Sequence, residues 1–355
     1  MIRIGDFKPT KEHIDIVNEI IKSGRLTEGV YVARLERLME KYLNVKHAIL
    51  TTNGTVSMQL IAHMFRTPAT VCVPALTFPA TINAFLLTGN KVVLCEVNQL
   101  MQMDISTLTE EQKKEIDVIV PVHLMGMTVE MDEIMTEAKK YGWYVIEDAA
   151  EAFGAEYNGK KVGTIGDFGS FSFYMSHNIG CGELGMVVTN DDILNNLLRS
   201  KKNHGRKGDP LKFFHDYTGS NYKTTEFMAG MCYANMLNVN DILEKRLNNA
   251  KYFFEKVDNE NLQNMPILKG MSPLGYCFRC YNEEYKDYIC KKLNDNSVET
   301  RDMFPCLKNQ KAYKGMFNGD FEVAEHLEKV VFYVGVHQHL TKKDKEKIVK
   351  ILNDN

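Results

Sequence analysis

Two groups of titratable side chains follow short apolar runs of this sequence. Asp148 and Glu151 come at the end of the run 144–147, and His177 lies with Ser172 in a polar stretch at the end of a second run. A buried carboxylate needs a cationic partner, because its pKa otherwise rises, and a protonated ring nitrogen would be such a partner for Asp148. A histidine titrates near neutral pH and can act as a base. These residue types favour a site that moves protons.

Two further stretches carry groups that can bind phosphate. The first is the junction where a helix opens with small residues, Gly54, Thr55 and Val56. The second is a polar loop with three basic side chains, His204, Arg206 and Lys207. At the helix start, the free backbone amides of Thr55 and Val56 and the helix dipole together would hold a phosphate.

Each of these features also has a structural interpretation. The junction can be a plain tight turn, and Asp148 can simply cap the helix that follows it. A single histidine in a turn is more often a satisfied structural residue, and most basic runs are solvated surface. The four features support a functional site only when they are taken together and in their order along the chain.

Short β-rich runs alternate with helical segments from residue 47 to about residue 203. The runs are 47–51, 70–73, 91–96, 118–122, 144–147, 169–173 and 185–189. Apolar strands separated by helices predict an α/β fold, with a mostly parallel sheet covered on both faces. In such a sheet ligands bind at the carboxyl ends of the strands, which is where Asp148 falls.

The pattern changes after residue 237. A long charged helix over 240–257 leads into strand-like and helical segments typical of a smaller α+β domain. We therefore predict two domains, a large domain over 1–237 and a small domain over 238–355. No Pro/Gly/Ser-rich linker marks the boundary.

Composition excludes several classes of protein. The 355 residues contain 43 Lys+Arg and 46 Asp+Glu, a net charge of -3 that offers no field for nucleic acid or an anionic membrane. No apolar run approaches the ~20 residues of a membrane span, and the charged N-terminus does not read as an export signal. With 8 cysteines in 355 residues, we expect reduced thiols and a cytoplasmic enzyme.

With these elements in order, the sequence resembles the DegT/DnrJ/EryC1/StrS sugar aminotransferases, which are pyridoxal-phosphate enzymes of fold type I. The resemblance covers nearly the whole chain. The segments that carry it are 24–29, 53–55, 74–78, 121–124, 147–150, 171–189, 203–206 and 299–301. It implies an aspartate-aminotransferase-like three-layer sandwich with a mostly parallel mixed sheet, plus a smaller C-terminal α+β domain.

The resemblance also assigns roles to single residues. Asp148 should pair with the cofactor's ring nitrogen and keep the ring an electron sink. The amides of Thr55 and Val56 and the hydroxyl of Ser172 should hold the cofactor phosphate. Three further positions match residues around the cofactor: Phe78 packs against the ring, Glu151 lies near it, and Asn221 reaches the phosphate of the neighbouring subunit. The working unit should therefore be a homodimer with shared active sites.

One position departs from the family. Where the family has a lysine, in a pattern such as Phe-Pro-Ser-Lys-Asn, this chain reads Tyr-Met-Ser-His-Asn over 174–178, so that His177 takes the lysine's place. Imidazole cannot form the covalent imine that lysine forms with pyridoxal phosphate. Histidine here is typical of a smaller branch, the nucleotide-sugar 3-dehydratases, which use pyridoxamine phosphate.

Other positions point both ways. The segments 221–226 and 332–336 resemble the dehydratases, whereas Leu184 interrupts their usual Gly-Glu-Gly-Gly and 301–305 looks more like an aminotransferase. An iron–sulfur cluster or another metal site has little support in the sequence. Cys277 and Cys280 would point to opposite faces of one strand, and 203–220 contains no cysteine. We expect no bound metal.

These features predict a dehydratase that acts on a nucleotide-linked 4-keto-6-deoxyhexose. His177 takes a proton from the cofactor's C4′ carbon and protonates the C3 hydroxyl as it leaves, and glutamate regenerates the cofactor's amine form. The candidate substrate contacts are His204, Arg206 and Lys207 for the nucleotide diphosphate, and Arg301 for a carboxylate or phosphate. Two alternatives remain open: a catalytically silent member of the family, and an aminotransferase whose lysine has been replaced.

Overall fold

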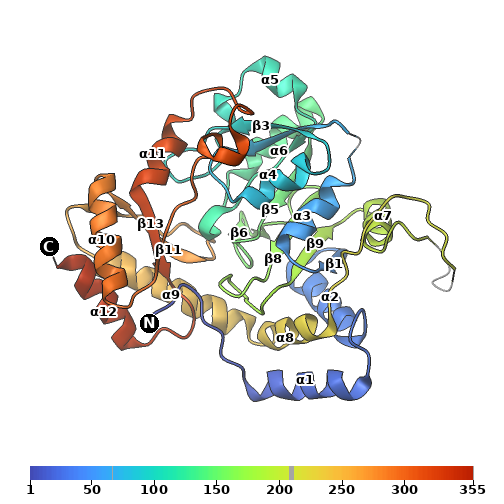
Figure 1. The fold of residues 1–355 in the computed structure, drawn as a ribbon, viewed down its shortest axis with the longest axis horizontal. Coiled ribbons are helices and arrows are strands. Elements are labelled where there is room, and N and C mark those ends of the chain that lie inside the picture. The colour runs from blue at the N-terminus through green and yellow to red at the C-terminus, as the bar shows by residue number, and fades with distance from the viewer. Residues whose placement is uncertain (66, 208–211, 355) are drawn as a thin grey trace.

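A seven-stranded sheet forms the centre of the protein (Figure 1). The computed structural model describes residues 1–65, 67–207 and 212–354. The strand order is β1-β9-β8-β5-β4-β2-β3. The strands are β1 (His47–Thr51), β2 (Thr70–Pro74), β3 (Lys91–Cys95), β4 (Val118–Ile119), β5 (Tyr144–Asp148), β8 (Phe168–Ser172) and β9 (Gly185–Thr189). Only β9 runs against its neighbours, so the predicted mostly parallel mixed sheet is confirmed.

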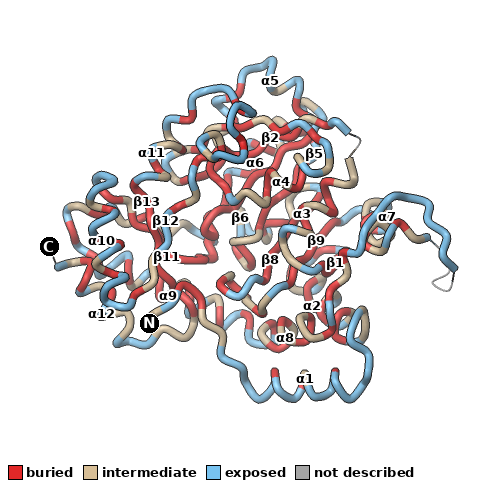
Figure 2. Tube along the Cα trace, viewed as in Figure 1, coloured by how far each residue is buried: buried red, intermediate tan, exposed pale blue. Residues whose placement is uncertain are grey.

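Helices cover both faces of this sheet, as near-continuous apolar strands require. Hydrophobic contacts place α3, α4 and α7 on one face, and α2, α6 and α8 on the other, with α1 packed against α8. Figure 2 shows the resulting buried centre between exposed outer helices. These helices, with the short α5, are α1 (Lys11–Ser23), α2 (Val30–Leu43), α3 (Gly54–Ala62), α4 (Pro79–Leu86), α5 (Glu110–Glu115), α6 (Met131–Tyr141), α7 (Asp192–Lys202) and α8 (Glu226–Met236).

The C-terminal part has its own sheet and hydrophobic cluster. Its four antiparallel strands have the order β10-β11-β13-β12 and are β10 (Leu262–Asn264), β11 (Gly275–Cys280), β12 (Thr300–Asp302) and β13 (Val331–Gly335). Its helices are α9 (Val239–Lys256), α10 (Glu283–Asp295), α11 (Glu322–Val330) and α12 (Lys342–Asn353). A two-stranded ribbon, β6 (Glu156–Tyr157) and β7 (Lys160–Lys161), completes the strands. The domain division at residue 237 stays a prediction.

Two local expectations differ from the structure. The run 118–122 forms a strand only to Ile119, because Pro121 has no amide hydrogen for a continued ladder. Helix α8 was not predicted, because its residues are apolar nearly all the way round and show no helical period. Among the described residues, no helix combines the length and apolarity needed to cross a membrane.

Candidate active site

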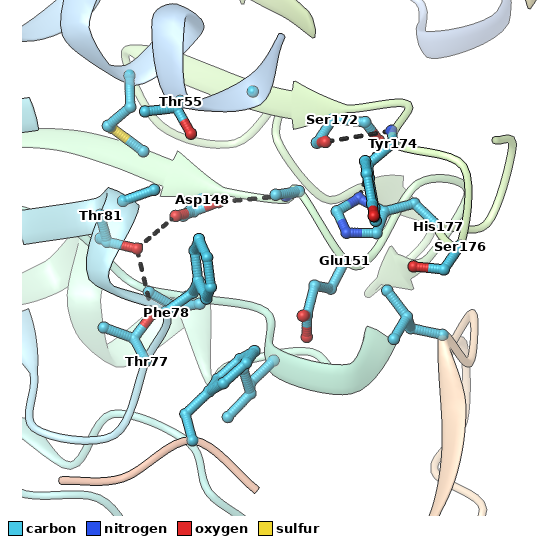
Figure 3. Close-up of a pocket in the computed structure, with 18 of the residues that line it drawn as sticks. Thr55, Thr77, Phe78, Thr81, Asp148, Glu151, Ser172, Tyr174, Ser176 and His177 are labelled. Carbon is cyan, nitrogen blue, oxygen red and sulfur yellow. Dashed lines mark hydrogen bonds between the residues drawn. The ribbon is translucent and has the colours of Figure 1, made fainter. Parts of the chain in front are cut away.

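A cavity of about 510 Å³ opens where the carboxyl ends of β5 and β8 face the strands β12 and β13. Most of the predicted site residues line it, although they come from five separate parts of the chain. These are Gly54, Thr55, Phe78, Asp148, Glu151, Ser172, His177 and Arg301. Figure 3 shows the side chains of Asp148, Phe78, Glu151 and His177 arranged around one open space.

Asp148 ends β5 and is only 8% exposed. Its Oδ2 accepts a hydrogen bond from the Thr81 hydroxyl at 2.8 Å, and its Oδ1 accepts one from the Ala150 amide at 3.2 Å. Burial raises the pKa of Asp148, and these two hydrogen bonds lower it in part. No lysine or arginine among the described residues forms an ion pair with this carboxylate. It faces the cavity as a buried acid that lacks a cation.

A buried pair beneath the site fixes this end of β5. Glu147 accepts hydrogen bonds from His123 at 3.1 Å and from three backbone amides, those of Gly163, Ile165 and Gly166. The Val129 amide donates to His123 Nδ1, so the proton of His123 lies on Nε2 and points to Glu147. Sequence reasoning missed this pair, because both residues were visible only as parts of longer motifs.

The N-terminus of α3 forms another wall of the cavity. A Cβ on Gly54 would lie 2.6 Å from the Ser172 Cβ, so only glycine allows the helix to come this close to β8. Asn53 caps the helix and accepts the Val56 amide at 2.9 Å. The Val56 amide therefore already has a partner, and the residue lies outside the cavity lining, so that its predicted phosphate contact stays a prediction. Thr55 and the Ser172 hydroxyl remain as the phosphate-binding groups that face the cavity.

His177 lies in the cavity with one ring nitrogen anchored. Its Nδ1 is 3.3 Å from the carbonyl oxygen of Ser172, which can only accept, so Nδ1 carries the proton and Nε2 is the basic nitrogen. The Tyr174 ring contacts the imidazole edge-on, with the centroids 5.7 Å apart. Burial, together with the nearby cations Arg246 and Arg301, lowers the pKa of His177 to about 4. The ring is therefore neutral at pH 7.

Glu151 and Phe78 complete the walls. Glu151 Oε2 accepts the Met125 amide at 2.8 Å, and burial raises the pKa of this carboxyl to about 7. Phe78 is 53% exposed and lies against Phe304, with ring centroids 5.4 Å apart. An exposed aromatic face beside a buried acid is suited to a flat aromatic ligand.

Besides Val56, four predicted residues lie away from this cavity. Three are in the arm 203–220, whose residues 208–211 fall outside the described part: His204, Arg206 and Lys207. Figure 1 shows this arm extending from the body of the protein beyond α7. There the Lys207 amine pairs with Asp216 at 3.2 Å, and the guanidinium of Arg206 lies 4.4 Å from the Phe213 ring centroid. The fourth, Asn221, is exposed at the base of the arm.

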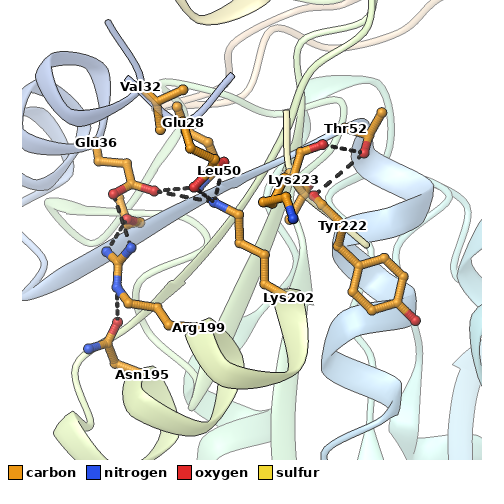
Figure 4. Close-up of polar contacts among 12 residues, drawn as sticks. Glu28, Val32, Glu36, Leu50, Thr52, Asn195, Arg199, Lys202, Tyr222 and Lys223 are labelled. Atoms are coloured by element: carbon orange, nitrogen blue, oxygen red, sulfur yellow. Dashed lines mark hydrogen bonds and ion pairs between the residues drawn. The ribbon is translucent and has the colours of Figure 1, made fainter. Parts of the chain in front are cut away.

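The base of the arm is held firmly (Figure 4). The amine of Lys202 is buried and lies 3.0 Å from Glu28 Oε1. Arg199 pairs with Glu36 at 3.1 Å. On the other side, the Thr52 hydroxyl donates to the carbonyl of Lys223 at 3.2 Å. The last of these contacts attaches the segment around Asn221 to the β1–α3 junction, while the side chain of Asn221 is exposed.

The residues present fit pyridoxal phosphate or pyridoxamine phosphate. Asp148 is an unpaired buried acid for a protonated ring nitrogen, Phe78 offers an aromatic face, and Thr55 and Ser172 offer donors for a phosphate beside a helix N-terminus. Together with the three-layer fold, these features define the class: a pyridoxal-phosphate-dependent enzyme of fold type I.

Comparisons with known proteins identify the family. Residues 8–353 match the DegT/DnrJ/EryC1/StrS aminotransferase family. The GDP-perosamine synthase of Escherichia coli O157:H7 is 32% identical over 302 residues, which are 83% of this chain and 82% of that protein. The chain belongs to this family, and the expected cofactor is confirmed with it.

Solved structures confirm the fold. An aminotransferase from Helicobacter pylori involved in the biosynthesis of pseudoaminic acid superposes with a TM-score of 0.93 at 22% identity, covering 99% of this chain and 98% of that chain. A GDP-4-keto-6-deoxymannose 3-dehydratase with a trapped PLP-glutamate geminal diamine superposes with a TM-score of 0.90 at 21% identity, covering 99% and 100%. The fold is therefore common to aminotransferases and dehydratases, and the distinction between them lies in the site.

Proposed function

We propose that this protein is a pyridoxamine-phosphate-dependent dehydratase that removes the C3 hydroxyl of a nucleotide-linked 4-keto-6-deoxyhexose. The observation that carries the proposal is His177, which takes the place of the family's lysine in the cavity and keeps Nε2 unprotonated. A base that cannot bond covalently to the cofactor can move protons without capturing it.

The chain's own residues divide the work. When bound, pyridoxamine phosphate supplies an amine that condenses with the sugar ketone and a ring that accepts electrons. Asp148 stabilises the charge on the ring nitrogen, while Thr55 and Ser172 bind the phosphate. His177 accepts a proton at Nε2 and returns it to the C3 oxygen as that oxygen leaves. The Nδ1–H bond to the Ser172 carbonyl holds the ring and its tautomer during both transfers.

Glutamate balances the reaction. It supplies two electrons and leaves as 2-oxoglutarate and ammonia. The oxygen of C3 leaves as water, and one water is consumed by hydrolysis, so that no net water is formed. Arg301 lines the cavity and is the cation we assign to the donor's carboxylate or to a phosphate of the substrate. The 3-dehydratase that shares this fold was solved with a PLP-glutamate adduct, which supports glutamate as the donor.

We propose that the working unit is a cytoplasmic homodimer. Asn221 and the basic side chains of the arm lie outside the cavity of their own chain. The arm also exposes Phe213 and Phe214, which are 80% and 69% accessible. A second copy of the chain would cover these rings and receive Asn221, His204, Arg206 and Lys207 near its own cavity.

An aminotransferase, or a silent member of the family, is the second candidate. The aminotransferase is favoured by the family's description as aminotransferases and by the GDP-perosamine synthase relative. The two functions differ in the fate of the nitrogen: a dehydratase releases ammonia, whereas an aminotransferase leaves the nitrogen on the sugar.

The test is a reaction with defined reagents. The protein is incubated with pyridoxal phosphate, glutamate and GDP-4-keto-6-deoxymannose, and ammonia and the sugar's mass are followed; dTDP- and UDP-linked 4-keto-6-deoxyhexoses are run in parallel. Ammonia with a sugar that lacks one oxygen supports the proposal. An amino sugar without ammonia refutes it, and no turnover together with an unchanged cofactor spectrum on adding glutamate supports the silent member.

A further inference from the structure

A buried arginine in the C-terminal part is connected to two titratable groups of the cavity, His177 and Glu151. Arg246 lies on α9, is 2% exposed and is among the largest fully buried side chains. Its Nε donates to the carbonyl of Pro273 at 3.2 Å, and its Nη2 donates to the carbonyl of Leu274 at 2.6 Å. None of the ion pairs between described residues includes it. A buried guanidinium without an acidic partner is unusual, because desolvation of the charge is expensive.

The segment that Arg246 holds, residues 272–274, is named the strap here. On one side the strap receives Asn178, the residue after His177: Asn178 Nδ2 donates to the Ser272 carbonyl at 2.8 Å and lies 3.1 Å from its hydroxyl. Asn178 is 1% exposed, so these bonds fix it firmly. The strap thus anchors the turn that carries His177.

On its other side the strap packs against the segment Leu124–Gly126. The Ser272 amide donates to the Gly126 carbonyl at 3.0 Å, and the Leu274 amide donates to the Met125 carbonyl at 3.3 Å. Gly126 has a φ of +81°, and a Cβ there would lie 1.8 Å from the Ser272 oxygen, so the contact excludes any larger residue. Met125 in turn donates its amide to Glu151. One short segment is therefore linked to both His177 and Glu151.

We propose that Arg246 is a positioning residue for the proton-transfer step, acting through the strap on His177 and Glu151. The inference rests on the function proposed above. A planar guanidinium bonds two successive carbonyls through N–H groups held in fixed directions, whereas the ammonium of lysine is a compact charge on a flexible stem. Its charge has a second effect, since Arg246 lowers the pKa of His177 in addition to burial and so favours the neutral base.

Other charged and titratable groups also surround His177, so the contribution of Arg246 must be isolated by substitution. These groups are Arg301 on β12, Asp148 at the end of β5, Glu151 just after β5, and Glu183 in the segment that leads into β9. Arg246→Met removes both the planar guanidinium and its charge. Arg246→Lys keeps a charge but loses the planar guanidinium. The matched control is Lys245→Met, which removes an exposed cation of the same helix that is paired only with Asp241.

The first readout needs neither cofactor nor substrate. The Cε1–H signal of His177 is followed by NMR against pH in protein without cofactor, and is assigned by its loss in His177→Gln. We expect the pKa of His177 to rise in Arg246→Met and to stay at the wild-type value in Lys245→Met. An unchanged His177 titration in folded Arg246→Met overturns the electrostatic part of the inference, whatever reaction the enzyme catalyses.

The second readout is turnover in the ammonia assay. In folded Arg246→Lys, we expect kcat to fall at least about tenfold with KM changed less than about twofold, because misplaced groups weaken the chemical step more than binding. Ser272→Ala, which loses only the strap's hydroxyl contacts to Asn178 and to the Phe153 carbonyl, should lower kcat less. Wild-type kcat in Arg246→Lys overturns the positioning role. Absence of ammonia from the wild type would count against the proposed function alone, since the titration remains interpretable.

Discussion

The protonation state of His177 can be measured through the stability of the protein. Burial lowers its pKa from 6.5 to about 4, so between these pH values the unfolded chain binds a proton that the folded chain does not. The free energy of unfolding must therefore rise with pH across this window, and it must fall as the solution is acidified. The substitution that removes the effect is His177→Gln, which keeps a hydrogen-bonding side chain and cannot titrate.

The size of the effect follows from the two pKa values. Going from about pH 8 to about pH 5, the wild type should lose about 2 kcal/mol more unfolding free energy than His177→Gln does. Urea unfolding of the full chain at both pH values gives the difference, and His215→Gln controls for the loss of an exposed histidine. Equal losses in wild type and His177→Gln would refute the neutral base on which the mechanism depends.

Three further predictions concern the walls of the cavity. The pKa of Glu151 is raised to about 7, so the folded protein binds a proton there that the unfolded chain has lost. When the pH rises from about 4.5 to about 7, the wild type should therefore lose about 3 kcal/mol more unfolding free energy than Glu151→Gln does. Equal losses of the two proteins in urea unfolding would contradict the protonated carboxyl. Asp148→Asn should raise the Kd for pyridoxal phosphate at least about tenfold, measured by absorbance titration, because an amide does not stabilise a protonated ring nitrogen. Gly54→Ala should lower stability by about 1–3 kcal/mol in urea unfolding, because its Cβ would lie 2.6 Å from the Ser172 Cβ; an unchanged midpoint would show that α3 can move.

The sequence predicted the sheet and much of the candidate site for a physical reason. Parallel strands bring their carboxyl ends to one edge of the sheet. Asp148 and Ser172 end neighbouring strands, so they lie close together whatever the conformation of the loops that follow. His177 was predictable because its turn directly follows β8. The roles of the individual site residues stay predictions until they are tested by substitution.

The supporting contacts could not be predicted in this way. Arg246 acts on backbone carbonyls nearly thirty residues away, and a carbonyl has no side-chain type to search for. The hydrogen bond from the Val56 amide to Asn53 depends on the rotamer of Asn53, which decides whether that amide is available for a ligand. The position of the arm 203–220 could not be predicted either, because three basic residues in a loop do not indicate whether they lie near a cavity of their own chain or of another.

The central claim is that a histidine in place of the family's lysine makes this enzyme remove an oxygen rather than add a nitrogen. The most direct measurement compares the sugar products of wild type and His177→Lys by mass, with pyridoxal phosphate, glutamate and GDP-4-keto-6-deoxymannose. The account predicts a deoxygenated sugar and ammonia from the wild type, and an amino sugar without ammonia from His177→Lys. An amino sugar from the wild type would contradict it.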